Sequence, residues 1–153
     1  MELTTASKVT AYADLVGATW TSDATEQSQA IARATRYLNA IEWDGLRTDG
    51  RNQDNAWPRS YIVDRDGFAV DGLTIPKEIE EAANLLSIAE AANPGTLQPQ
   101  VTLDNRVVEE TIGPLSFKYD RAKGPGAARE IVLAVSDLIR PFVANRGYML
   151  TRA

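Results

Sequence analysis

The amino-acid sequence predicts a mainly α-helical fold: a small bundle of about four helices with two short β-hairpin insertions and an extended C-terminal tail. Apolar residues recur at three- and four-residue steps in separate stretches, which is the period of an amphipathic helix. Turn-forming Asp, Asn, Gly and Pro residues separate these stretches. A chain of 153 residues suits one domain over 1–153, with the helical core and its hairpins in 1–145 and the tail in 146–153.

The first predicted helix runs to about Leu15, with Thr5 or Ser7 as its cap and Gly17 as its stop. Its buried stripe is predicted to consist of Val9, Tyr12, Ala13 and Val16. A helix this short is marginal alone, so we expect it to pack against the next helix along the chain.

The longest periodic stretch predicts a second helix over 23–42. Ser22 or Asp23 is suited to cap it, and Asp23 followed by Glu26 has the spacing of a capping box. Its apolar face is predicted to contain Ala30, Ile31, Ala34, Leu38 and Ile41. The opposite face is expected to be solvated and consists of Glu26, Gln27, Gln29, Arg33, Arg36 and Asn39.

A polar loop over 44–56 follows and closes on Trp57-Pro58-Arg59. We expect the large indole of Trp57 to pin this loop onto the helices, because it has much apolar area to bury. The segments 61–63 and 68–70 flank an Asp-Gly turn, which predicts the first short hairpin.

Ile75-Pro76 is expected to open a third helix that ends at Asn93-Pro94-Gly95, because proline suits the first helical position. Its predicted apolar face is Ile79, Ala82, Ala83, Leu86 and Ala89. The second hairpin is predicted from the alternation of Leu115, Phe117 and Tyr119, with 106–112 as the partner strand. Such a hairpin adds little to one core and is better explained if a neighbouring subunit covers it.

The last helix is predicted over 127–145, with a kink or stop at Pro141. Its apolar face would contain Ile131, Val135, Leu138, Ile139 and Phe142. The tail after it combines two arginines with Tyr148, Met149 and Leu150. Because free tails are usually polar, this apolar content indicates a partner.

The composition limits the possible functions. The chain has no cysteine and no histidine, which excludes disulfides, Cys or His metal sites, and Cys-His or Ser-His catalysis. Its net charge of −5 argues against a protein whose main task is to hold a phosphate backbone. No apolar run approaches the length of a membrane span and no signal peptide is evident, so we expect a protein of the cytoplasm in which it is made.

Three groups of carboxylates invite a metal or catalytic interpretation. Asp64, Asp66 and Asp71 surround a glycine but lack the fifth-position ligand and the distal Glu of a calcium loop. The second group could be proposed as a magnesium site and consists of Asp44, Asp49 and Asp54. We favour the interpretation that these loop aspartates form turns. Glu109 and Glu110 are adjacent on a predicted strand and would point to opposite faces. A carboxylate-metal hydrolase is therefore only a third alternative.

Cations interleaved with aromatic residues are typical of single-stranded nucleic-acid binding. The residues that fit this pattern are Arg33, Arg36, Lys118, Arg121, Lys123 and Arg129, with Tyr37, Phe117 and Tyr119. In a net negative chain, the interpretation we favour is that these aromatics belong to the core and the cations to the surface.

The order of several motifs resembles a known family. These motifs are Ala34-Thr35-Arg36-Tyr37-Leu38, then Trp57-Pro58-Arg59, Ile75-Pro76, and Ile112-Gly113-Pro114-Leu115 leading into Tyr119. Over 30–142, the chain resembles the head-tail adaptor (connector) proteins of tailed phages. Some relatives of these proteins are labelled as DnaT-like single-stranded DNA-binding proteins.

The resemblance implies a non-enzymatic subunit without a cofactor that forms a ring, commonly of twelve copies, at the head-tail junction of the virion. The ring would join the portal protein to a stopper or tail-completion protein and let genomic DNA pass, without contact to a membrane. An acidic chain suits such a channel because it repels the sliding phosphates. The alternative is a single-stranded DNA-binding replication accessory protein.

The resemblance also suggests roles for particular residues. The candidate portal-docking segment comprises Pro141, Phe142, Arg146, Tyr148, Met149, Leu150 and Arg152. The candidate inter-subunit or stopper contacts are Asp49, Arg51, Asp54, Phe117 and Tyr119. The expected structural anchors are Trp57, Pro58, Arg59 and Pro76.

Overall fold

The computed structural model describes residues 1–97, 109–112, 115–118 and 126–144. This part of the chain contains four α-helices: α1 (Ala6–Val16), α2 (Ala24–Asn39), α3 (Lys77–Ala92) and α4 (Gly126–Ile139). Two small antiparallel sheets accompany them: β1 (Leu46–Arg47) with β2 (Arg59–Ser60), and β3 (Glu109–Ile112) with β4 (Leu115–Lys118). Short 3-10 helices are η1 (Gly50–Asn52) and η3 (Arg140–Phe142). The predicted mainly α-helical class with small β insertions is confirmed.

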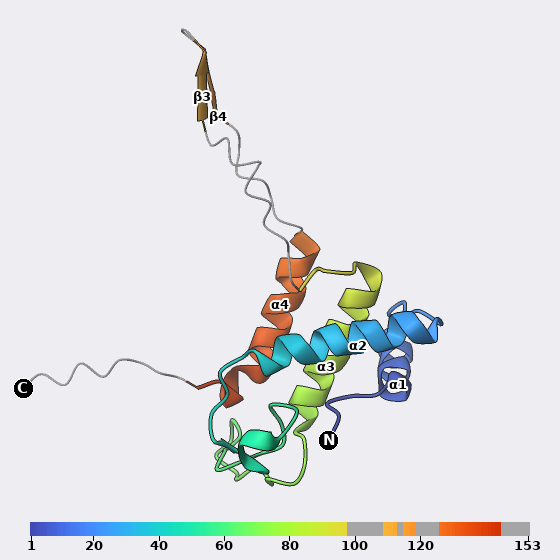
Figure 1. The fold of residues 1–153 in the computed structure, drawn as a ribbon, viewed down its shortest axis with the longest axis vertical. Coiled ribbons are helices and arrows are strands. Elements are labelled where there is room, and N and C mark those ends of the chain that lie inside the picture. The colour runs from blue at the N-terminus through green and yellow to red at the C-terminus, as the bar shows by residue number, and fades with distance from the viewer. Residues whose placement is uncertain (98–108, 113–114, 119–125, 145–153) are drawn as a thin grey trace, which may run out of the picture.

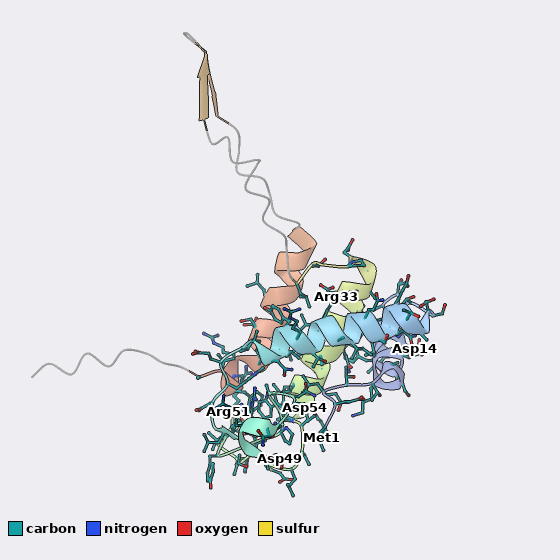
Figure 2. The ribbon with its side chains drawn as sticks, in the orientation of Figure 1. Met1, Asp14, Arg33, Asp49, Arg51 and Asp54 are labelled. Carbon is teal, nitrogen blue, oxygen red and sulfur yellow. The ribbon has the colours of Figure 1, made fainter. Side chains whose placement is uncertain are left out.

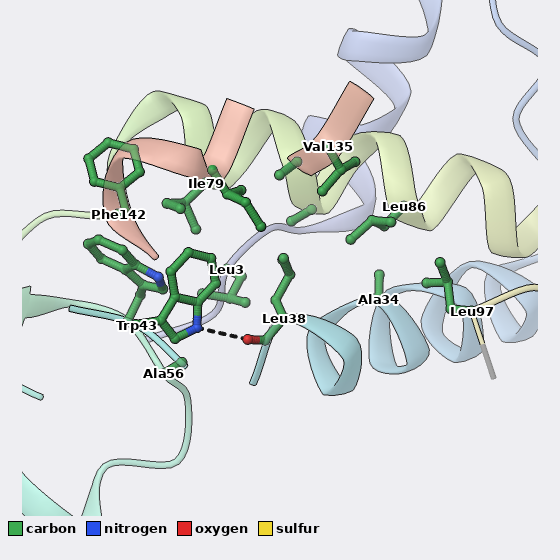
Figure 3. Close-up of a cluster of buried hydrophobic side chains, with 14 of the residues drawn as sticks. Leu3, Ala34, Leu38, Trp43, Ala56, Ile79, Leu86, Leu97, Val135 and Phe142 are labelled. Carbon is green, nitrogen blue, oxygen red and sulfur yellow. Dashed lines mark hydrogen bonds between the residues drawn. The ribbon is translucent and has the colours of Figure 1, made fainter. Parts of the chain in front are cut away.

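Helix α3 is the centre of the fold and packs against α1, α2 and α4 (Figure 1). All five residues predicted for its apolar face are buried. The core continues from α3 to one face of α2, to the end of α4 and to the N-terminal Leu3 (Figure 3). None of the helices in the described ranges is long and apolar enough to cross a membrane.

Local signals set the ends of the first two helices. Thr5 Oγ1 accepts a hydrogen bond from the Lys8 amide, and α1 ends at Gly17, whose φ of 69° is left-handed. Asp23 caps α2 by accepting from the amides of Thr25 (2.8 Å) and Glu26 (3.0 Å). The capping box is only half formed, because the Glu26 side chain accepts from Thr21 Oγ1.

Helix α2 ends at Asn39, three residues before the predicted end. The Trp43 indole explains this stop, because its Nε1 donates to the Leu38 carbonyl oxygen (2.8 Å). In a longer helix, this carbonyl would have accepted a backbone hydrogen bond from the next turn. Val16 in α1, which was predicted to be buried, is exposed.

The face of α2 predicted to be solvated is partly a packing surface. Asn39 Oδ1 accepts from the Ala56 amide (2.7 Å) and its Nδ2 donates to Asn55 Oδ1 (3.0 Å). Arg33 is tied to a buried carboxylate of α3. The prediction was wrong for both residues because their partners come from segments distant in sequence.

The segment 43–75 between α2 and α3 is called the insert below. Its sheet, β1 with β2, uses loop residues that were not predicted as strands. The predicted hairpin is reduced to one bridge between Val63 and Ala69, with backbone bonds from Val70 N to Ile62 O and from Asp64 N to Phe68 O, both 2.9 Å.

The second predicted hairpin is confirmed where the structure describes it. Glu110 lies opposite Phe117 and Ile112 lies opposite Leu115 in the β3–β4 pair. Tyr119 and residues 106–108 lie outside the described ranges. Helix α4 ends at Ile139, before Pro141, as proline requires, and the predicted extension to 145 is replaced by η3.

Candidate functional site

The insert is attached to the end of the helical bundle by an aromatic cluster. Trp57 is fully buried and meets Trp43 and Phe142 edge-on, with its ring centroid 5.5 and 5.6 Å from theirs. Pro58, joined to Trp57 by a cis peptide bond, is also buried. Trp57 Nε1 has no hydrogen-bond partner among the described residues. The cluster joins the insert to both α2 and the end of α4.

Arg59 closes the insert through backbone carbonyls. Its guanidinium donates to the carbonyl oxygens of Asp44 (2.7 Å), Gly45 (2.8 Å) and Ala56 (3.2 Å). Burial, and secondarily the charge of Arg47, lower the pKa of Arg59 from its ordinary value. Arg59 therefore holds the two ends of the loop together and has little donor capacity left for a ligand.

The outer surface of the insert is mixed in character. The three charged residues predicted as inter-subunit contacts, Asp49, Arg51 and Asp54, are exposed on it (Figure 2). Several large apolar side chains are exposed on it as well: Leu46, Tyr61, Val63, Phe68 and Leu73. The insert thus combines a firmly packed inner side with an outer side that carries both charged and apolar side chains.

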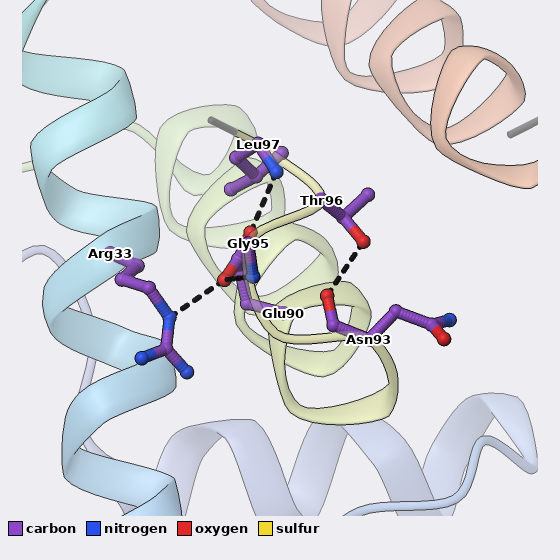
Figure 4. Close-up of polar contacts among 6 residues, drawn as sticks. All are labelled: Arg33, Glu90, Asn93, Gly95, Thr96 and Leu97. Carbon is purple, nitrogen blue, oxygen red and sulfur yellow. Dashed lines mark hydrogen bonds and ion pairs between the residues drawn. The ribbon is translucent and has the colours of Figure 1, made fainter. Parts of the chain in front are cut away.

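A buried carboxylate fixes the turn after α3. Glu90 is fully buried; its Oε2 pairs with Arg33 Nε (2.7 Å) and accepts from the Gly95 amide (3.0 Å). Its Oε1 accepts from the Leu97 amide (2.7 Å), so both oxygens are used (Figure 4). This set of bonds, called the Glu90 latch below, ties α2 to the point where the chain leaves α3.

A groove of ≈ 670 Å³ lies between the N-terminal segment and the outer face of α2. Ile31, Ala32 and Thr35 of α2 contribute to its lining together with Leu3 and Thr5. Arg36 also lines it and, within the described ranges, makes no hydrogen bond or ion pair. Two arginines one turn apart on α2 therefore differ: Arg33 is held in the latch and Arg36 faces the groove.

The insert carboxylates shape turns. Asp64 Oδ1 accepts from the amides of Asp66 (2.9 Å) and Phe68 (2.8 Å), and Asp71 Oδ1 accepts from the Leu73 amide (3.0 Å). In the part of the chain that the structure describes, no group of three or more Asp, Glu, His or Cys side chains is arranged to hold a metal ion.

Comparison with known proteins gives one family. Residues 3–153 match the sequence model of a family described as "Putative DnaT-like ssDNA binding protein". The chain belongs to this family. No curated protein and no solved structure matches the chain.

The residues of the predicted nucleic-acid pattern are only partly brought together. On α2, Arg33 is in the latch, Arg36 lines the groove and Tyr37 packs against the core. Phe117 and Lys118 lie in β4 and Arg129 lies in α4. Tyr119, Arg121 and Lys123 fall outside the described ranges.

The candidate docking segment needs one correction. Phe142 is 1% exposed and packs against Trp57, so its ring is part of the core and is not presented to a partner. The turn of η3 carries it there, continuing the apolar face of α4 past Pro141. Arg146, Tyr148, Met149, Leu150 and Arg152 lie outside the described ranges. The anchor residue Pro76 is the residue before the first turn of α3.

Sequence reasoning missed Glu90. A signal was present, because Glu90 lies four residues after Leu86 and seven after Ala83, on the apolar face of α3. A carboxylate at such a position is either a break in the core or a buried, partnered group. The contacts of Arg59 and Asn39 had no comparable signal, because Arg59 donates to backbone carbonyls of the loop and Asn39 bonds to the Ala56 amide and the Asn55 side chain, mostly distant in sequence.

Proposed function

We propose that the chain binds single-stranded DNA, and that the cations that do so lie in the segment 117–129. One observation carries this proposal: the family to which the chain belongs is described as binding single-stranded DNA. The sequence of the segment fits, since it contains four cations, Phe117 and Tyr119 and a single carboxylate, Asp120. Cations beside stacking aromatics are the common means of holding single strands.

The charge distribution explains how an acidic chain would bind DNA. Residues 1–97 carry eight Lys and Arg against fifteen Asp and Glu, whereas residues 98–153 carry eight against six, which together make the chain's 16 and 21. Several cations of the first part are engaged within the fold, among them Lys8, Arg33 and Arg59. The helical body would therefore repel phosphates and leave binding to the more basic part.

The test compares two variants of equal charge by fluorescence titration of a labelled oligo(dT) at several salt concentrations. One variant replaces four cations of the segment by Gln: Lys118, Arg121, Lys123 and Arg129. The matched control replaces four exposed cations elsewhere by Gln: Arg51, Arg65, Lys77 and Arg140. We expect only the first variant to lose binding. The slope of its log binding constant against log salt concentration should be smaller in magnitude than that of the wild type by up to about 3.

Two results count against the proposal. Equal losses in both variants would mean that net charge alone decides binding and that the segment is not the site. A wild-type chain that ignores the oligonucleotide even at low salt would mean that the description of the family does not extend to this chain.

We propose a second candidate, a non-enzymatic structural subunit of a phage neck. The order of motifs from Trp57-Pro58-Arg59 to Ile75-Pro76 favours it, and so do the acidic body and the exposed apolar residues of the insert. The subunit would form a ring, by analogy of twelve copies, between the portal and a stopper in the virion. The family description mentions no phage role, so it supports the first proposal more directly.

The second candidate is tested by mass measurement in solution, alone and with the portal protein from the same genome. A ring that forms on the portal, from a chain that ignores oligonucleotide, would favour the neck function. A chain that binds oligonucleotide and shows no interaction with the portal would rule it out.

A further inference from the structure

All the Asp-Gly dipeptides of the chain lie in the insert. They are Asp44-Gly45, Asp49-Gly50, Asp66-Gly67 and Asp71-Gly72. Aspartate isomerises most readily in such dipeptides, because glycine has no Cβ to shield its amide nitrogen from the neighbouring carboxyl group. The nitrogen attacks the carboxyl carbon, a molecule of water leaves, and a succinimide ring forms. Hydrolysis of this ring gives either the original aspartate or an isoaspartate, in which the backbone runs through the side-chain carboxyl.

The fold decides how fast each dipeptide reacts. Ring closure turns the carboxyl group and the glycine nitrogen onto each other, so hydrogen bonds that hold either group must break first. Each such bond slows the reaction by about two- to tenfold, which is how the usual net strength of one hydrogen bond changes a rate. Dipeptides of the same sequence in one chain can therefore be ranked by the bonds that hold them.

The peptide unit between Asp44 and Gly45 is held on both sides. The Asp44 amide donates to the Phe142 carbonyl oxygen (2.9 Å). The carbonyl oxygens of Asp44 and Gly45 accept from Arg59 (2.7 and 2.8 Å). The Gly45 amide donates to Asp44 Oδ1 (2.9 Å), which directs the amide hydrogen at a carboxylate oxygen. The nitrogen can turn onto the carboxyl carbon only if the bonds to Arg59 break.

The dipeptides that begin at Asp66 and Asp71 each have one reacting group engaged. Asp71 Oδ1 accepts from the Leu73 amide (3.0 Å). The Gly67 amide, which would be the attacking group at Asp66, donates to the Asp64 carbonyl oxygen (3.2 Å). Closing either ring therefore breaks a bond of a tight turn.

Asp49-Gly50 is the exception. Both residues are exposed, and Asp49 lies on the outer surface of the insert (Figure 2). Within the described ranges, neither the Asp49 carboxylate nor the Gly50 amide makes a hydrogen bond or ion pair. Gln53 bonds only to the flanking groups, the Asp49 amide (3.1 Å) and the Gly50 carbonyl oxygen (3.4 Å). A Cβ added to Gly50 would meet nothing within 4 Å, so the ring has room to form.

We propose that Asp49 isomerises spontaneously in the folded protein, and that the fold protects the other Asp-Gly dipeptides. The reaction needs no enzyme, oxidant or reductant, because the water released on ring closure is taken up again on hydrolysis. The isoaspartate keeps a carboxylate and hence the net charge of −5, but it lengthens the backbone of the loop by one carbon and shortens the side chain. Asp49 is a predicted inter-subunit contact, so the product would change that surface. The modification is independent of both candidate functions.

The test incubates the purified protein in neutral buffer and follows each dipeptide over time by proteolytic digestion and mass spectrometry. Electron-transfer fragmentation distinguishes isoaspartate from aspartate, which have equal mass, and the succinimide is lighter by one water. In the folded protein, we expect isoaspartate at Asp49 to accumulate at least about twofold faster than at any other dipeptide, with Asp44 the slowest. In a parallel sample unfolded in urea, the rates should converge, because the hydrogen bonds that separate them are lost.

Two variants serve as controls. Asp49→Glu keeps the charge but cannot close the same ring, so it should abolish the product at this position. Asp66→Glu makes the same change in another exposed turn and should leave the rate at Asp49 unaltered. Two results would overturn the proposal. One is a folded protein in which another Asp-Gly dipeptide reacts as fast as Asp49. The other is an Asp49 that stays intact in the folded protein while the unfolded sample reacts.

Discussion

Replacing Glu90 by Ala should destabilise the protein by about 3–5 kcal/mol, because each donor left unsatisfied costs about 1–3 kcal/mol, with Arg33, which is 32% exposed, at the low end. The substitution leaves three donors without their acceptor: Arg33 Nε and the amides of Gly95 and Leu97. Since a domain of this size loses about 2–4 °C of melting temperature per kcal/mol, the melting temperature should fall by about 10 °C. Urea denaturation followed by circular dichroism measures the change in unfolding free energy.

Controls separate the latch from a general effect of charge. Glu78→Ala removes an exposed carboxylate from the first turn of the same helix and should cost less than about 1 kcal/mol. A double-mutant cycle with Arg33→Ala should give a coupling of at least about 1 kcal/mol. If Glu90→Ala lies within about 0.5 kcal/mol of the wild type, or the cycle is additive, the latch does not contribute as described.

Three further predictions concern the insert and α2. Trp57→Ala should lower the unfolding free energy by about 3–5 kcal/mol in urea denaturation, because it empties a fully buried site; an unchanged midpoint would contradict its role as an anchor. Gly45→Ala should strongly lower the melting temperature, since Gly45 has φ of 65° and an added Cβ would collide with the Ser60 carbonyl; a wild-type melt would refute this steric argument. Hydrogen bonds from the amides of Glu26 and Thr25 lower the pKa of Asp23, so the stabilisation that this cap contributes is present above the unfolded pKa of 3.8 and is lost as pH falls through the folded pKa. The difference in melting temperature between wild type and Asp23→Ala should therefore disappear in acid. A difference that persists in acid would contradict this prediction.

The sequence predicted the helices well because their signals are local. Pro76 before α3 and the three- and four-residue spacing from Ile79 onward need no knowledge of the rest of the chain. Gly17 and Asp23 likewise set helix ends through their own backbone and side chain. The strands of β1 and β2, by contrast, are two residues long and carry no alternation that sequence reasoning can detect.

The candidate site was less predictable because it depends on contacts between distant residues. Arg33 and Glu90 lie 57 positions apart, and Thr4 donates to Asn84 over 80 positions. Periodicity assigned Arg33 to the solvent side of α2, which is correct for an isolated helix and wrong once α3 is placed beside it. For Phe142 the local signal was right: periodicity placed it on the apolar face of the last helix and it is buried, whereas the docking role that the resemblance suggested does not fit a residue in the core.

The central position of α3 has a consequence for local opening. Helix α1 buries only Val9 and Ala13; of its polar bonds to α3, that of Lys8 to Glu80 is exposed and that of Tyr12 to Glu81 is only partly buried. Its amides should therefore exchange with deuterium through detachment of α1 alone, at a free energy below that of global unfolding. The amides of α3, which every other helix covers, should exchange only when the whole domain unfolds. We therefore expect α1 to be the less stable outer helix, and α2, α3 and α4 to unfold together as one cooperative unit.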